Sequence, residues 1–213
     1  MSASFDGEVK ARIIELRFAE SGKIAHVSKH TGDLVKKGNL VASLDRKMLQ
    51  IELDRQLNDF EKVRADFERF AEKHPDPQDE NKFIKAEKQA QLNASVKDVE
   101  LTKAKLDQAD LFAPIDGIIL DDSNILPGIY VSPASSAVKL IDTGAYYFEF
   151  EIKQKNIHDF METRKCVVKI DMAPENIEAK TGTIVPDGKK FVVRVALPEN
   201  KWVLLGMRGI CKF

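Results

Sequence analysis

Residues 40–57, LVASLDRKMLQIELDRQL, contain the transition that decides the fold of this chain. The short apolar run that ends at Asp45 is typical of a β-strand, whereas the apolar residues that follow recur at helical spacing. The carboxylate of Asp45 can accept a hydrogen bond from a free amide of a first helical turn, so we expect it to cap a helix that begins near residue 46. A β-region therefore ends here and a helical segment begins.

The helical segment covers residues 46–109 and is predicted to form a hairpin of two long helices. It contains no glycine, and its two prolines, Pro75 and Pro77, stand together in a single break. A proline lacks the amide hydrogen that a helix needs and disfavours helix at the residue before it. In the first helix the spacing of 4, 3, 4, 3, 4 and 3 residues predicts a heptad seam made by Leu49, Leu53, Gln56, Phe60, Val63, Phe67 and Phe70.

The second helix is expected from about residue 81 to residue 109, with a seam of smaller residues. That seam is predicted to contain Phe83, Ala86, Ala90, Ala94, Leu101 and Ala104, with Val96, Val99 and Leu106 beside it. Alanines that face the first helix would let the two helices approach closely.

The segments on either side of the hairpin resemble each other. Residues 21–45 read SGKIAHVSKHTGDLVKKGNLVASLD, and residues 116–142 read DGIILDDSNILPGIYVSPASSAVKLID. In each, a glycine opens an apolar strand (Gly22 and Gly117), and a later turn glycine precedes a valine by three residues. Those pairs are Gly32 with Val35 and Gly128 with Val131. Since neither half could bury its apolar face alone, we interpret them as an internal repeat that pairs into one flattened barrel.

The composition narrows the classes of function. The chain has 213 residues, is 43% hydrophobic and 31% charged, and carries a formal net charge of −1, which favours neither nucleic acid nor an anionic membrane as a partner. Cys166 and Cys211 match no zinc or redox spacing, so two buried thiols are expected, with a disulfide as the alternative in an oxidising compartment. No apolar run approaches the roughly 18 residues that a membrane span needs.

Three motifs in this order resemble the membrane-fusion proteins, the periplasmic adaptors of the HlyD type and of RND efflux pumps. The first motif, a half of the lipoyl-like domain, is carried by Gly22, Ile24, Gly32, Asp33, Val35, Gly38, Leu40, Leu44 and Asp45. The second, LFAPIDGII, resembles the re-entry strand of the other half through Ala113, Pro114, Asp116, Gly117 and Ile119. The third resembles the closing turn of the adaptor barrel through Leu205, Gly206, Met207 and Gly209.

The resemblance implies a mainly β, elongated fold with an inserted α-helical hairpin. We expect a β-barrel domain from residues 1–20 and 145–213, a split lipoyl/biotinyl-like domain from residues 21–45 and 110–144, and a coiled-coil hairpin from residues 46–109. It also implies a non-enzymatic subunit without cofactor, catalytic residue or bound metal. Such adaptors lie outside the cytoplasm, and we expect an anchor to the inner membrane in an N-terminal segment outside this sequence.

The partners that the resemblance implies are an inner-membrane transporter, an outer-membrane or cell-envelope partner, and further copies of the chain in a ring. The hairpin tip is the expected contact with the outer partner, through Glu72, Lys73, His74, Asp76, Gln78, Asp79 and Glu80. One departure concerns the R-x-x-x-L-x-x-x-x-x-x-S pattern that many adaptors carry around the tip. Glu68 follows Arg64 by four residues and Lys73 follows Arg69 by four, so the pattern is absent.

Two other sites compete with this interpretation. Lys47 stands where a carrier domain holds its lysine, so the alternative function is a biotin- or lipoate-carrying domain of an enzyme complex. A carrier lysine needs a strand that returns at once, whereas here about 28 helical residues follow, and a solvated first-turn lysine is favoured. His26 and His30 are candidate metal ligands, but four residues of extended strand separate them by about 13 Å.

Overall fold

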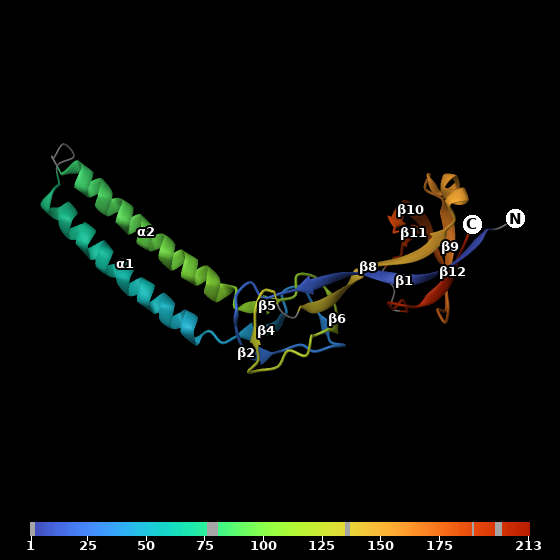
Figure 1. Ribbon diagram of the computed structural model, residues 1–213, viewed down its shortest axis with the longest axis horizontal. Helices are drawn as coiled ribbons and strands as arrows, with labels where there is room; N and C mark the ends of the chain where they lie inside the picture. Colours follow the sequence, from blue (N-terminus) through green and yellow to red (C-terminus); the bar gives the residue numbers. More distant parts are fainter. Residues whose placement is uncertain (1–2, 76–80, 135–136, 189, 199–201) are drawn as a thin grey trace.

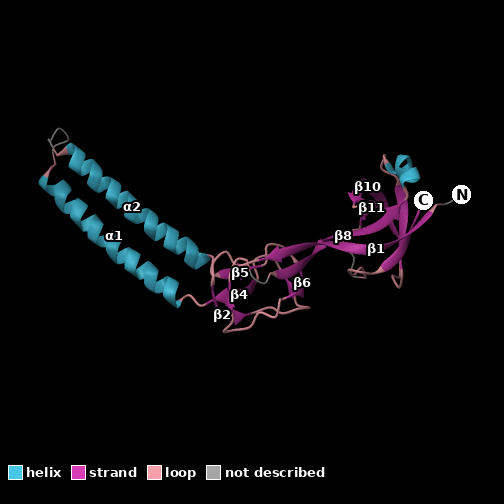
Figure 2. Cartoon of the chain, in the orientation of Figure 1, coloured by secondary structure: helices cyan, strands magenta, loops and turns pink. Residues whose placement is uncertain are grey.

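The computed structural model describes residues 3–75, 81–134, 137–188, 190–198 and 202–213. The molecule is elongated, with the helical hairpin at one end and both chain termini at the other (Figure 1). Helix is concentrated in the hairpin, and the rest of the described chain is mostly strand and loop (Figure 2). The predicted fold class, mainly β with an inserted helical hairpin, is confirmed.

The order of the elements follows the expected division into strands, hairpin and strands. The strands before the hairpin are β1 (Ser4–Leu16), β2 (Gly22–Val27), β3 (Leu34–Val35) and β4 (Leu40–Leu44). The helices are α1 (Lys47–Lys73) and α2 (Lys82–Asp107). The elements after them are β5 (Asp110–Phe112), β6 (Gly117–Asp121), β7 (Tyr130–Val131), β8 (Val138–Ile152), the 3₁₀ helix η1 (Gln154–Phe160), β9 (Lys165–Ile170), β10 (Ile177–Asp187), β11 (Lys190–Ala196) and β12 (Arg208–Lys212).

The strands near the termini close into a barrel. They pair in the order β1-β12-β9-β10-β11-β8, and an antiparallel pairing of β1 with β8 completes the circle. Its interior is filled by alternate residues of these strands, among them Val9, Phe148, Phe150, Val168, Val193, Val195 and Cys211. Phe160 of η1 packs with Phe5, Phe150 and Phe213, so an aromatic cluster is part of the barrel core near the termini.

The two repeat halves share a second core, as predicted. Strand β2 of the first half pairs with β7 of the second, β3 pairs with β6, and β4 pairs with β5. Because strands of one half pair with strands of the other, each half buries the apolar face of the other. The buried residues include Ile24, Val35, Val41 and Leu44 from the first half and Leu111, Ile119, Val131 and Leu140 from the second.

Strands β1 and β8 run without interruption through both cores. Leu16 and Val138 lie in the core of the repeat halves, whereas Val9 and Phe148 lie in the barrel core. A register shift in the β1–β8 pairing, between Ala11 and Ile13, separates the two regions. The boundaries expected between the two β domains therefore remain a prediction, since the same two strands serve both cores.

The first helix packs as predicted, whereas in the second only Val96, Val99 and Leu106, predicted beside the seam, turn away from solvent as expected. All seven seam residues of α1 are half-buried. In α2, however, Phe83 is 76% exposed, Leu101 is 57% exposed, and the four seam alanines are exposed as well. The residues of α2 that turn away from solvent are instead Lys85, Lys88, Leu92, Ser95, Val96, Val99, Thr102, Lys105 and Leu106.

The physical reason for this correction lies at the base of α2. Ala109, two residues after the helix, is completely buried in the core of the repeat halves, and Thr102 is the buried residue of the helix itself. The turn into β5 therefore sets the rotation of α2 about its axis. The helix face that continues from Ala109 through Leu106 and Thr102 must point at α1, whichever face is richer in alanine.

Candidate functional site

The base of the hairpin is held by backbone and charge together. Leu44 donates a backbone hydrogen bond to the carbonyl of Ala109, 2.8 Å away, and Ser43 pairs with Asp110 between β4 and β5. Arg46 forms an ion pair with Asp110. The predicted cap residue is Asp45, but Arg46 occupies the cap position; the carboxylate of Asp45 still accepts a 2.9 Å hydrogen bond from the amide of Lys47 in the first turn. The hairpin thus begins after β4 and ends before β5, two strands that pair with each other.

Lys88 of α2 contacts two residues of α1 and so connects the two helices of the hairpin. The ammonium of Lys88 on α2 pairs with Asp66 of α1 and lies 5.6 Å from the centre of the Phe70 ring. Hydrogen bonds from Lys88 and then Arg69 lower the pKa of Asp66 below its usual value. A lysine therefore lies at the helix interface, where the predicted seam consists mainly of alanines.

In the described part of the tip, His74 contacts residues at the ends of both helices. This residue follows the last residue of α1, and its ring lies against that of Phe70, with 4.6 Å between the ring centres. A nitrogen of the same ring is 3.2 Å from the side-chain nitrogen of Asn81, at the start of α2. Glu72 and Lys73 are exposed in the last turn of α1. Asp76, Gln78, Asp79 and Glu80 lie outside the described residues, so the structure brings together only part of the predicted tip site.

A surface that sequence reasoning missed runs along the outer side of α2. It is made by Phe83, Ala86, Ala90, Ala94, Leu101 and Ala104, the residues predicted to be its seam, and we call it the outer face of α2. The apolar spacing places these residues on one face of α2, as a seam requires. What the spacing could not show is that the other face of α2 contacts α1.

Lys47 is an exposed residue at the start of α1. It does not stand between two adjoining strands, because it is the first of the 27 helical residues of α1. The structure therefore places Lys47 as the favoured interpretation did, at a solvated first turn.

The motif glycines and their neighbours shape the turns of the repeat halves and of the barrel. Gly32 and Gly128 occupy corresponding turns with φ of 93° and 96°, a backbone region that other residues rarely adopt. The carboxylate of Asp33 accepts a hydrogen bond from the amide of His30 in the first of these turns. The remaining motif residues lie in strands or turns of the two cores: Gly22, Val35, Gly38, Pro114, Gly117, Gly206, Met207 and Gly209.

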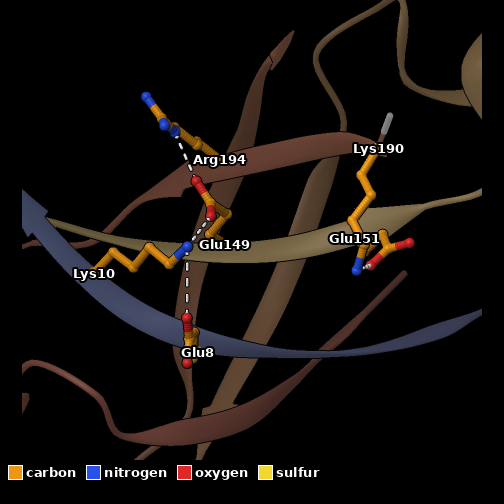
Figure 3. Close-up of polar contacts among 6 residues, drawn as sticks. All are labelled: Glu8, Lys10, Glu149, Glu151, Lys190 and Arg194. Atoms are coloured by element: carbon orange, nitrogen blue, oxygen red, sulfur yellow. Dashed lines mark hydrogen bonds and ion pairs between the residues drawn. The ribbon is translucent and has the colours of Figure 1, made fainter. Parts of the chain in front are cut away.

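A charged network crosses the outside of the barrel (Figure 3). The side chain of Glu149 on β8 is only 6% exposed, and it accepts hydrogen bonds from Lys10 of β1 and from Arg194 of β11. Burial alone would raise the pKa of Glu149, but the hydrogen bonds from Lys10 and Arg194 outweigh it, and the pKa is lowered. Glu149 thereby links β8 to its two neighbours in the barrel, β1 and β11, at the place where the barrel closes.

The two histidines that are candidate metal ligands have different surroundings. His30 lies 3.3 Å from Asp122, so it connects the Gly32 turn to the residue that follows β6, while His26 is exposed on β2. Within the described ranges no three His, Cys, Asp or Glu side chains are gathered as metal ligands would be. Cys166 and Cys211 are free, buried thiols of the barrel core, and burial raises the pKa of both.

Comparison with solved structures places this architecture among known folds. The chain resembles a MacA–MexA chimeric protein that contains the Pseudomonas aeruginosa MexA α-hairpin domain, with 17% identity, a TM-score of 0.85, and 99% of this chain and 78% of that one covered. It also resembles the membrane fusion protein Spr0693 from Streptococcus pneumoniae R6, with 12% identity, a TM-score of 0.79, and coverage of 99% and 97%. A third similar structure is the periplasmic adaptor protein EmrA, with 16% identity, a TM-score of 0.55, and coverage of 99% and 98%.

These likenesses confirm that the chain has the fold of membrane-fusion and periplasmic adaptor proteins. No protein-family model matches the chain, and neither does any curated protein. Among the helices of the described residues, none is both long and apolar enough to span a membrane.

Proposed function

We propose that this protein is a non-enzymatic adaptor subunit of an efflux, transport or secretion system outside the cytoplasm. The observation that carries the proposal is the placement of the hairpin at one end of the molecule and of the barrel and both termini at the other (Figure 1). A molecule of this shape can contact two different partners at once. Under the proposal these are an inner-membrane transporter near the barrel and an outer-membrane or cell-envelope partner at the hairpin tip.

The hairpin is suited to reach a partner because it carries little of the folding core. All the residues of α1 are at least partly exposed, and Thr102 is the buried residue of α2. A helix pair of this kind contributes few buried side chains to the protein that bears it, so its length serves reach. The 27 residues of α1 correspond to about 40 Å at 1.5 Å per residue.

Self-association into a ring is part of the proposal, and the outer face of α2 supports it. Large apolar residues such as Phe83 and Leu101 are exposed there beside small ones, a composition suited to packing against another helix. Neighbouring copies in a ring would cover this face with their own hairpins while the tips remain free. An N-terminal membrane anchor, in a segment that precedes this sequence, would hold the barrel end at the inner membrane.

The test compares charge reversal at the tip with charge reversal on the shaft. The tip variant changes Glu72, Asp76, Asp79 and Glu80 to lysine. The shaft variant changes four other acidic residues to lysine, all of them exposed and without an ion pair to a described residue: Asp54, Glu61, Asp98 and Asp107. Both change the net charge equally. Surface substitutions of this kind usually alter the free energy of unfolding by about 0.5 kcal/mol or less each.

We expect the tip variant to abolish export in cells and the shaft variant to retain most of it, with similar melting temperatures for both. Equal export by the two variants would contradict docking through the tip. In that event the β domains and the outer face of α2 would remain as the surfaces for partners.

A further inference from the structure

Three lysines gather on the outer wall of the barrel, near the chain termini. Lys165 of β9 lies directly opposite Lys180 of β10, and Lys212 of β12 lies opposite Val167 on the other side of β9. Together with Glu178 they border a depression of about 460 Å³. We call it the lysine depression.

The charge of the lysine depression is unbalanced. Its lining has three lysine side chains and one glutamate side chain, and none of the three lysines forms an ion pair with a residue that the structure describes. Like charges directly opposite each other on an antiparallel pair destabilise a sheet. Elsewhere on the barrel, lysines such as Lys10 and Lys190 are paired with glutamates. The unpaired lysines therefore form a site at which an external anion would relieve the repulsion.

Apolar side chains also line the lysine depression. They belong to Cys166, Val167, Ala179 and Phe213, of which Cys166 is buried and Val167 half-buried. A site lined by both lysines and apolar side chains suits a partner that carries both an anionic group and hydrocarbon. Lysine binds phosphate as a point charge, without the planar geometry that arginine imposes.

The position of the depression indicates which anionic surface it faces. Phe213 is the C-terminal residue and lies with the N-terminus at the end of the molecule remote from the hairpin (Figure 1). The formal net charge of −1 for the whole chain conceals this local excess, because the acidic residues that balance it lie elsewhere. A local cluster of lysines is what an anionic membrane surface attracts.

We infer that the lysine depression binds the phosphate headgroups of anionic phospholipids and docks the barrel end on a membrane surface. The choice of a membrane over an acidic protein rests on the proposed function, in which this end faces the inner membrane. Binding through the depression needs neither a transporter nor an outer partner. It can therefore be measured on the isolated protein, and its failure would leave the adaptor function standing.

The experiment measures co-sedimentation of the protein with vesicles. One set contains phosphatidylcholine alone, and the other contains phosphatidylcholine mixed with phosphatidylglycerol. The test variant is K165Q/K180Q/K212Q. The control variant, K36Q/K37Q/K103Q, removes the same charge from exposed lysines of the β3–β4 loop and of α2, which likewise form no ion pair with a described residue.

We expect the unmodified protein to bind the vesicles that contain phosphatidylglycerol, to bind them less as salt rises, and to leave those of phosphatidylcholine alone. Each lysine near an anionic membrane strengthens binding by about fivefold, so the test variant should lose on the order of a hundredfold in partition and the control variant little. Absence of binding to the anionic vesicles would overturn the inference and favour an acidic protein as the partner. Equal losses in the two variants would overturn it too, since binding would then follow net charge alone.

Discussion

Arg46 and Asp110 form an ion pair across the base of the hairpin, and they join the residue before α1 to the first residue of β5. The side chain of Asp110 is 16% exposed, so this contact is partly shielded from solvent. The hairpin therefore starts and finishes at one corner of the β structure. Its removal leaves two chain ends that a short turn can join.

The first prediction concerns that removal. Replacing residues 47–107 by a short glycine-rich turn should leave a soluble β-protein, because Leu44, Ala109 and Leu111 of the core remain in place. The far-ultraviolet circular dichroism should lose its helical signal, and thermal unfolding should stay cooperative. Aggregation of the shortened protein would mean that the hairpin packs back on the β domains.

The second prediction concerns the rotation of α2. Ala90 is exposed and Leu92 is half-buried against α1, so a cysteine should react with a maleimide several-fold faster at position 90 than at position 92. The native Cys166 and Cys211 determine the background level of maleimide labelling. They are buried with raised pKa values, and the unmodified protein should therefore react only after unfolding. Faster labelling at position 92 would mean that the alanine face of α2 contacts α1, as the sequence suggested.

The third prediction concerns the closure of the barrel. The variant E149Q should lower the free energy of unfolding at neutral pH by about 2 kcal/mol, because two charge-assisted hydrogen bonds are weakened. Glu151, whose side chain is 55% exposed beside Lys190, supplies the control: E151Q should cost no more than about 0.5 kcal/mol.

The pH dependence of the same variant follows from the lowered pKa of Glu149. A carboxyl whose pKa is lower in the folded state than its ordinary 4.5 stabilises the fold above that value. This stabilisation is lost as the pH falls through the folded-state pKa. Urea unfolding should thus show the difference between the unmodified protein and E149Q at neutral pH, and the difference should shrink in acid. A difference that does not vary with pH would contradict the ionic role of Glu149.

The fourth prediction concerns Gly117 of the re-entry strand. A Cβ at this position would lie 2.1 Å from the carbonyl oxygen of Ile141 on β8, so the backbone must shift to admit it. G117A should therefore lower the free energy of unfolding by about 1–3 kcal/mol. In the control G144A the nearest atom is the carboxylate oxygen of Asp142 at 3.5 Å, and little change is expected. Similar denaturant midpoints for the two variants would show that the β6–β8 approach is looser than the structure indicates.

The sequence by itself determined the elements of this protein and their broad arrangement. Hydrophobic spacing and the single proline break predicted the hairpin, and the matching glycines at positions 32 and 128 predicted two halves of one domain. These signals are local, because a helical period, a proline and a turn glycine act through the backbone of their own few residues. The seam of α1 was predictable for the same reason.

Only the tertiary structure decided which surfaces meet. The burial of Ala109 set the rotation of α2 and left its alanine face outside. The pairing of β1 with β8 closed the barrel and placed Lys10 and Arg194 on either side of Glu149. The registers of β9, β10 and β12 brought Lys165, Lys180 and Lys212 together. Such contacts join residues far apart in the chain, and their geometry depends on how the cores are buried, which spacing along one segment does not contain.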